Sequence, residues 1–152
     1  MATEAPDRKK MIEFLNDDLS REYQAVIAYV VYSQVLKGAQ YMSIAKELKK
    51  HASEELDHAI KIANQIDYLG GMPNATAKPV KLSEDAKEML RADLENERVT
   101  IANYRTRVRQ ADAMGEFALS EVLREILVQE QEHLMDLATA LGIDAPDPGE
   151  AK

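Results

Sequence analysis

Two glutamate and histidine pairs with the same spacing are the residues of this chain best suited to chemistry. Glu55-Leu-Asp-His58 and Glu130-Gln-Glu-His133 each place a histidine three residues after a glutamate. In a helix, positions i and i+3 lie on one side about a turn apart, so each pair offers a carboxylate oxygen and an imidazole nitrogen to the same point. Both pairs fall on the apolar stripe of a long helical segment, where a charge is unfavourable. The pattern therefore predicts that the two pairs hold two metal ions.

Composition and punctuation predict four helices to carry these residues. The 152 residues include only six glycines and five prolines, and good helix formers dominate the long uninterrupted stretches. Gly38, Gly70-Gly71 and Gly142 are expected to end helices, and Ser83 is expected to cap the start of the third. The expected helices span about residues 7–37, 41–69, 84–114 and 116–141, and a tail follows at 143–152.

The connections predict how the helices pack. Segment 71–82 contains Pro73 and Pro79 and, if extended, spans roughly 40 Å, about the length of one helix. It can therefore cross from one end of a bundle to the other, so that the second and third helices run parallel. The other two connections are short turns. The expected fold is all-α, a single-domain four-helix bundle with one long crossover.

Each expected helix carries one glutamate near the middle of its apolar stripe. Glu22 follows Leu19 in the first helix and Glu97 follows Leu94 in the third, while the two Glu-x-x-His motifs occupy the second and fourth. Four buried carboxylates would repel one another and lose their hydration, so positive charge must compensate them. Four negative charges match two divalent cations, and neutral imidazoles add nitrogen ligands without charge.

The donor types restrict which metal is expected. Carboxylates and imidazoles without thiolate suit iron or manganese, although zinc also binds such sites, and iron is preferred if the work is redox. The predicted metal ligands are Glu22, Glu55, His58, Glu97, Glu130 and His133. Tyr29, one heptad after Glu22, is interpreted either as core packing or as a hydrogen-bond donor or electron source beside the metals. His51, on the same stripe, is interpreted as a satisfied core or cavity-facing histidine that can support the site.

Charge and composition restrict partners and compartment. The 19 basic and 27 acidic residues give a net charge of −8, which disfavours nucleic acid and anionic membranes and favours cations. The chain has no cysteine, which excludes disulfides, thiolate metal sites and cysteine nucleophiles. No apolar stretch approaches the length of a membrane span, and residues 1–10 do not resemble a signal peptide. We therefore expect a soluble, cytoplasmic protein.

The four-helix pattern of glutamates and Glu-x-x-His motifs resembles the ferritin-like di-metal carboxylate proteins, for which the same arrangement is a general rule. The resemblance is greatest to bacterioferritin and covers about residues 12–141. It includes Leu69-Gly-Gly-Met-Pro-Asn74, Met89-Leu-Arg-Ala-Asp-Leu94 and Ile126-Leu-Val-Gln-Glu-Gln-Glu-His133.

The resemblance implies a ferroxidase centre with two iron ions per chain. In that arrangement Glu55 and Glu130 bridge the ions, and Tyr29 matches the tyrosine beside the centre. The terminal ligands would be Glu22 with His58 on one ion, and Glu97 with His133 on the other.

Two departures from the bacterioferritin pattern limit what the resemblance implies. Bacterioferritin places its haem-ligating methionine directly after the first bridging glutamate, where this chain has Leu56, so haem is not expected. The family also usually ends in a short fifth helix, whereas residues 143–152 contain Pro146, Pro148 and Gly149 and are not expected to form one. A storage cage therefore does not follow from the resemblance.

The apolar residues of the first helix exceed what one buried stripe needs. Those outside the stripe are Val30, Val31, Val35 and Leu36. They predict a homo-oligomer built on a dimer.

Three hypotheses about function follow from the sequence. The first is a ferroxidase that oxidises Fe(II) with dioxygen or peroxide for iron storage or detoxification. The second is an oxidase or peroxidase outside a cage, with iron or manganese as a fixed cofactor. The third is a metal-stabilised bundle with a structural or partner-binding role.

Overall fold

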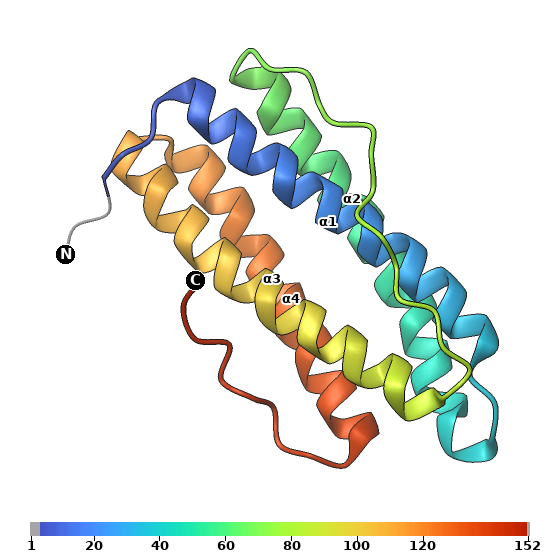
Figure 1. Cartoon of the computed structure of the whole chain (residues 1–152). Coiled ribbons are helices and arrows are strands. Elements are labelled where there is room, and N and C mark those ends of the chain that lie inside the picture. Colours follow the sequence, from blue (N-terminus) through green and yellow to red (C-terminus); the bar gives the residue numbers. More distant parts are fainter. Residues whose placement is uncertain (1–3, 152) are drawn as a thin grey trace.

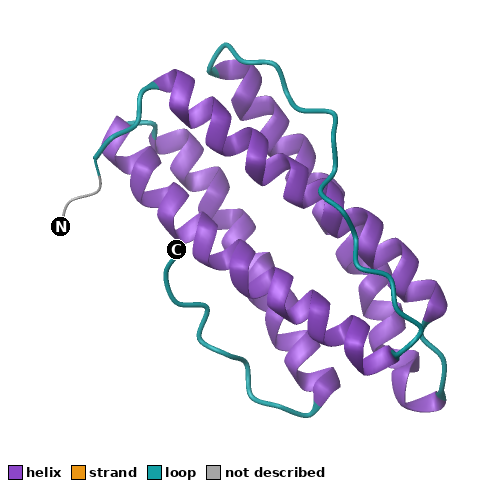
Figure 2. Cartoon of the chain, viewed as in Figure 1, coloured by secondary structure: helices purple, strands orange, loops and turns teal. Residues whose placement is uncertain are grey.

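The computed structural model describes residues 4–151, which form four long helices and contain no strand (Figures 1 and 2). The helices are α1 (Arg8–Val35), α2 (Met42–Tyr68), α3 (Ala86–Met114) and α4 (Phe117–Leu141), and a single 3-10 turn, η1 (Ala39–Tyr41), precedes α2. α1 packs along α2, and α3 packs along α4. The expected all-α four-helix bundle is confirmed.

The connection between α2 and α3 crosses the whole length of the bundle beside α1 (Figure 1). Hydrogen bonds join it to α1 along the way: Asn16 Nδ2 donates to the Met72 carbonyl, the Lys78 amide donates to the Ser20 carbonyl, and Gln24 Nε2 donates to the Pro79 carbonyl. Because this segment returns the chain to the opposite end, α2 and α3 run parallel. The predicted long crossover is therefore confirmed.

Two predicted helix boundaries were wrong. α1 ends at Val35 and not at residue 37, because Leu36 has an extended backbone (ψ 125°) and Gly38 adopts a φ of 114° that favours glycine. α3 is capped by Asp85 and not by Ser83. The Asp85 carboxylate accepts a hydrogen bond from the Glu88 amide at 2.7 Å, whereas Ser83 Oγ accepts one from the Asp85 amide just before the helix.

The buried core consists of two apolar clusters. One cluster includes Tyr32, Leu48, Leu90 and Leu137, and the other includes Met11, Leu15, Ile62, Leu119 and Leu123. The apolar stripes of all four helices are interrupted between these two clusters by buried acidic and imidazole side chains. The apolar packing on both sides thus positions a polar layer in the middle of the bundle.

The outer surface is apolar over part of α1 and α2. Ile27, Val30, Leu56 and Ile60 are each between 45% and 61% exposed. Leu36, which was expected on this surface, is instead buried in the core at 7% exposure. Among the described residues, none of the helices combines the length and the low charge needed to span a lipid bilayer.

The segment after α4 is extended and lies against α3 (Figure 1). Arg98 and Arg105 of α3 donate to the carbonyls of Pro148 and Gly149, and Arg109 forms a two-pronged ion pair with Glu150. Residues 143–151 contain no helix, as the prolines and glycine predicted.

Candidate metal centre

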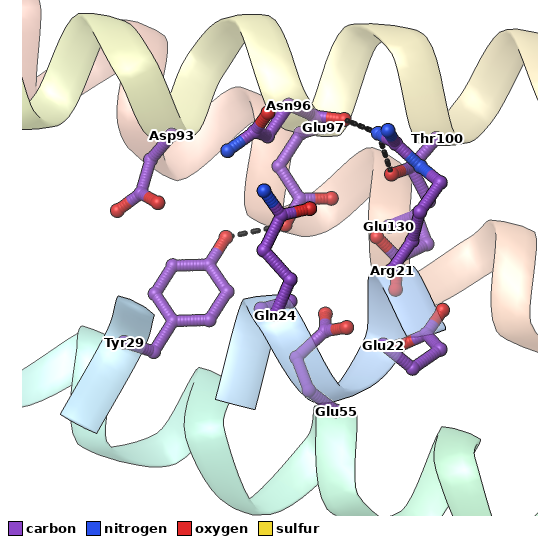
Figure 3. A pocket seen from close by; sticks show the side chains of 11 residues that line it. Arg21, Glu22, Gln24, Tyr29, Glu55, Asp93, Asn96, Glu97, Thr100 and Glu130 are labelled. Carbon is purple, nitrogen blue, oxygen red and sulfur yellow. Dashed lines mark hydrogen bonds between the residues drawn. The ribbon is translucent and has the colours of Figure 1, made fainter. Parts of the chain in front are cut away.

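The six side chains predicted as metal ligands lie together in the polar layer. They come from all four helices, and each residue is 3% exposed or less: Glu22, Glu55, His58, Glu97, Glu130 and His133. Figure 3 shows the four carboxylates pointing toward a common space from different helices. The small enclosed space beside them is also lined by Tyr29 and Asp93.

The first half of the centre gathers around His58. Its Nδ1 atom lies 2.8 Å from Glu130 Oε1, 3.6 Å from Glu22 Oε2 and 3.8 Å from Glu55 Oε2. One ligand atom from each of these four residues lies within 4.8 Å of the other three. The imidazole is therefore closer to the glutamate of the opposite motif than to the glutamate of its own.

The second half repeats this arrangement around His133. Its Nδ1 atom lies 2.8 Å from Glu55 Oε1 and 3.7 Å from Glu97 Oε1. Together with Glu130, these residues again offer one ligand atom each within 4.8 Å of the other three. Glu55 and Glu130 belong to both halves, whereas the other four residues belong to one half each. The two halves therefore share two carboxylates.

Most of the inward-facing polar atoms have no hydrogen-bond partner in the described part of the chain. These atoms include Nδ1 of both histidines, Oε1 of Glu55 and both carboxylate oxygens of Glu130. The 2.8 Å contacts lack hydrogen-bonding geometry, so these atoms face a shared space without satisfying one another. Leaving so many buried polar atoms unpaired is costly. Two divalent cations would satisfy them, and the residues present therefore fit a dinuclear metal site.

Two tyrosines hold the outer carboxylates in place. Tyr29 of α1 donates a hydrogen bond to Glu97 of α3, and Tyr104 of α3 donates one to Glu22 of α1. Both tyrosines are fully buried. Each hydroxyl group fixes one carboxylate oxygen, and the second oxygen of each glutamate is buried without a hydrogen-bond partner among the described residues.

Without a bound ion, the pKa values of four residues of the centre are shifted toward the protonated form. Burial, together with the neighbouring carboxylates, raises the pKa of Glu55 and Glu130 well above the usual glutamate range. Burial acts against a charged His133, but attraction to the nearby carboxylates of Glu97 and Glu130 prevails and raises the pKa of His133 to about 9. The pKa of His58 is raised for the same reason by Glu130 and Glu22. Protons on these residues would then supply part of the positive charge that compensates the buried carboxylates.

A ring stack extends the centre toward one end of the bundle. The His51 and His133 rings stack with centroids 4.0 Å apart, and Tyr29 packs edge-on against His51 at 5.1 Å. His51 Nε2 lies 2.9 Å from Asp136 Oδ2. His51 is thus the core-facing histidine that the sequence predicted, and it contacts a candidate ligand directly.

Comparison with known proteins identifies the family of this chain. The ferritin-like domain family matches residues 12–144. This chain belongs to the ferritin-like family. The chain is 33% identical over 135 residues to a bacterioferritin of Brucella melitensis, and the alignment covers 88% of this chain and 84% of that protein. A bacterioferritin of Rhodobacter capsulatus is 28% identical with the same coverage of both.

Solved structures of ferritin-like proteins also resemble this one. A ferritin-like di-iron carboxylate protein from Bacillus anthracis has a TM-score of 0.85 and 32% identity, over 90% of this chain and 99% of that chain. A dodecameric thioferritin related to bacterioferritin, from Bacteroides fragilis, has a TM-score of 0.83 and 28% identity, over 90% and 86% of the two chains.

Three residues of this ferritin-like centre were missed by the sequence analysis. Tyr104 was not among the predicted site residues, although the spacing from Glu97 to Tyr104 repeats the spacing from Glu22 to Tyr29. Gln129, next to Glu130 in the chain, accepts a hydrogen bond from the outer nitrogen of His58. Glu54 lies 3.7 Å from the outer nitrogen of His133. Such partners orient a ligating imidazole. Only the tyrosine has a repeated spacing that reveals it from sequence.

Proposed function

We propose that this chain is a ferroxidase that binds two Fe(II) ions as substrates and oxidises them to Fe(III) for iron storage or detoxification. The sharing of Glu55 and Glu130 between the two halves of the centre carries the proposal, because shared carboxylates are suited to holding two ions close together. Four carboxylates also balance two divalent cations. The bacterioferritin and di-iron carboxylate relatives support the same activity at the level of the family.

The proposed ligand set follows the two halves of the centre. Glu55 and Glu130 would bridge both ions, and the terminal ligands would be Glu22 with His58 on one ion and Glu97 with His133 on the other. Tyr29 supports Glu97 through its hydrogen bond. The donor set also suits manganese. Iron is favoured because it can supply electrons to an oxidant.

The reaction transfers two electrons from each pair of Fe(II) ions to the oxidant. Two Fe(II) ions become two Fe(III) ions, and the two electrons with two protons reduce one dioxygen to hydrogen peroxide, or one hydrogen peroxide to two waters. The shared carboxylates of Glu55 and Glu130 would hold the two ions close together. The apolar clusters on both sides limit access of water, and the raised pKa values of Glu55 and Glu130 mean that any proton they hold would have to leave before the carboxylates could ligate the ions.

Anaerobic loading followed by exposure to air tests the proposal. The purified protein is loaded with about ten Fe(II) ions per chain and then aerated while Fe(III) absorbance is recorded. A ferroxidase converts all of the iron at a rate well above that of iron in buffer. Oxidation that stops after two ions per chain would indicate a fixed di-iron cofactor, and oxidation no faster than in buffer would indicate a metal-stabilised bundle.

We also propose that the chain forms a homo-oligomer built on a dimer. Ile27 and Leu56 line an exposed apolar groove of about 430 Å³ between α1 and α2, and the related thioferritin from Bacteroides fragilis is dodecameric. Burial of such a surface favours association. Ile27→Glu should reduce the mass measured by light scattering, whereas Val128→Glu, at an exposed apolar position of α4, should not. A monomeric parent protein would contradict the proposal.

A further inference from the structure

A separate cluster of possible metal ligands lies about one helical turn from the dinuclear centre. Glu47 and His51 of α2 are four residues apart and therefore lie on the same side of the helix, and Asp136 of α4 meets them. One ligand atom from each of the three residues lies within 4.8 Å of the other two. None of these residues is among the six ligands of the dinuclear centre.

The imidazole of this cluster is buried, while its carboxylates reach the surface. His51 is 1% exposed, whereas the Asp136 side chain is 43% exposed. Glu47 and Asp136 line a surface pocket of about 200 Å³. His51 Nε2 reaches Asp136 at 2.9 Å, and His51 Nδ1 has no hydrogen-bond partner among the described residues. The cluster is therefore open to solvent on one side and has a fixed nitrogen on the other.

The two carboxylates of the cluster have no basic side chain paired with them in the described part of the chain. No lysine or arginine of the described residues forms an ion pair with Glu47 or Asp136, and the only partner of Asp136 is His51. Two carboxylates around a neutral imidazole carry the charge that one divalent cation would balance. A half-exposed carboxylate can also move toward a shared ion, which would lie about 2 Å from each donor atom.

We propose that Glu47, His51 and Asp136 bind a third divalent cation. One imidazole and two carboxylates suit first-row ions such as Fe(II), Mn(II) or Co(II), and the open pocket leaves positions for water. His51 would then join this site to the dinuclear centre through its stack on His133. The cation site does not require ferroxidase activity; only its occupation by Fe(II) in function rests on the proposed function.

Equilibrium dialysis with Co(II), which does not oxidise in air under these conditions, tests the site. The parent protein should bind three Co(II) ions per chain. Asp136→Asn and Glu47→Gln each remove one charge with little change of shape and should lower the number to two. Glu132→Gln removes a charge from an exposed position of α4, one turn from Asp136, and should leave three. Circular dichroism verifies that each variant is folded.

A second variant separates this site from the dinuclear centre. The double variant Glu55→Ala and Glu130→Ala lacks both shared carboxylates and should still bind one Co(II) ion per chain. Adding Asp136→Asn to this variant should abolish the remaining Co(II) binding. Two ions in the parent protein, or three in Asp136→Asn, would overturn the third site. A parent protein that binds a single ion sensitive to Asp136→Asn would retain the third site and overturn the dinuclear centre.

Discussion

Tyr29 donates its hydroxyl hydrogen to Glu97 across the bundle, and this contact has a counterpart in which Tyr104 donates to Glu22. Each tyrosine lies seven residues after the glutamate of its own helix and supports the glutamate of the other. The two halves of the centre are therefore held by equivalent hydrogen bonds. They differ in their surroundings, because Tyr29 also packs against the rings of His51 and His133 at 5.1 and 5.9 Å.

This difference predicts unequal effects of removing the two hydroxyl groups. Tyr29→Phe and Tyr104→Phe each lose one buried hydrogen bond and should lower the free energy of unfolding by about 1 kcal/mol. If Tyr29 also supplies electrons, only Tyr29→Phe should slow iron oxidation strongly and remove any tyrosyl radical signal after aeration. Stopped-flow absorbance and electron paramagnetic resonance measure both effects. Equal rates in the two variants would leave Tyr29 with a positioning role alone.

The shared carboxylates predict a ranking among ligand variants. Glu55→Ala removes a ligand of both ions, whereas Glu22→Ala removes a ligand of one, so Co(II) binding should fall from both positions in the first and from one in the second. Rapid iron oxidation should be lost in both. Glu125→Gln, at an exposed position of α4, serves as the control and should retain the parent rate. A Glu55→Ala protein that oxidises iron at the parent rate would remove this site from the mechanism.

Gathering four carboxylates in the core costs free energy of folding. Replacing one of them by an apolar residue should therefore raise stability while it abolishes activity. In the metal-free protein, Glu55→Leu replaces a buried ionisable group by an apolar one and relieves repulsion from Glu22. It should raise the free energy of unfolding by roughly 1 to 4 kcal/mol while abolishing ferroxidase activity. Thermal unfolding in the presence of a chelator measures the first effect. A lower melting temperature than that of the parent protein would show that the metal-free centre is not strained.

The positions of the six candidate ligands were largely predictable from sequence. Steps of three and four residues fix which side of a helix a residue occupies, so Glu22 and Glu97 could be distinguished from acidic neighbours such as Glu95 by their phase with the apolar stripe. The contacts of Tyr104 and Gln129 depend on how one helix is placed beside another. Helical phase alone does not determine that placement, although the repeated glutamate-to-tyrosine spacing is a usable signal.

Local features at helix ends were less predictable. Ser83 and Asp85 both have side chains that can cap a helix, and each accepts a backbone hydrogen bond. The sequence alone therefore does not determine which of the two is the N-cap residue of α3. Leu36 was expected outside the core because the first helix was extended past it. Once α1 ends at Val35, the extended backbone turns Leu36 inward against the core.

The protonation of the metal-free centre predicts that ion binding releases protons. The pKa values of Glu55 and Glu130 are raised by burial and by the neighbouring carboxylates, and His133, with a pKa of about 9, carries a proton at neutral pH before the ions bind. Ions compete with these protons, so affinity for Co(II) should increase as pH rises between about 6 and 8. A pH indicator in weakly buffered solution detects the released protons. Binding that is independent of pH would contradict the proposed ligands.

Bound ions should also stabilise the fold, because they bind the folded centre and not the unfolded chain. At a free concentration of 100 times the dissociation constant, each site contributes about 2.7 kcal/mol. The melting temperature should therefore rise with Co(II) in the parent protein and much less in Glu55→Ala. A melting temperature that does not respond to Co(II) or anaerobic Fe(II) would count against a folded metal site.

The residue after the first shared carboxylate predicts that the protein does not bind haem. Leu56 stands where bacterioferritin places its haem-ligating methionine, and a leucine side chain has no atom that can ligate iron. Leu56 is 52% exposed on the apolar surface of α2, so Leu56→Met would place a thioether there without disturbing the core. The parent protein, mixed with haem, should show no spectrum of methionine-ligated haem, whereas Leu56→Met should acquire one if two copies meet at this surface. Leu82→Met, at an exposed position of the crossover, is the matched control and should behave like the parent protein. A Soret band from tightly bound, methionine-ligated haem in the parent protein would show that another residue has taken over this role.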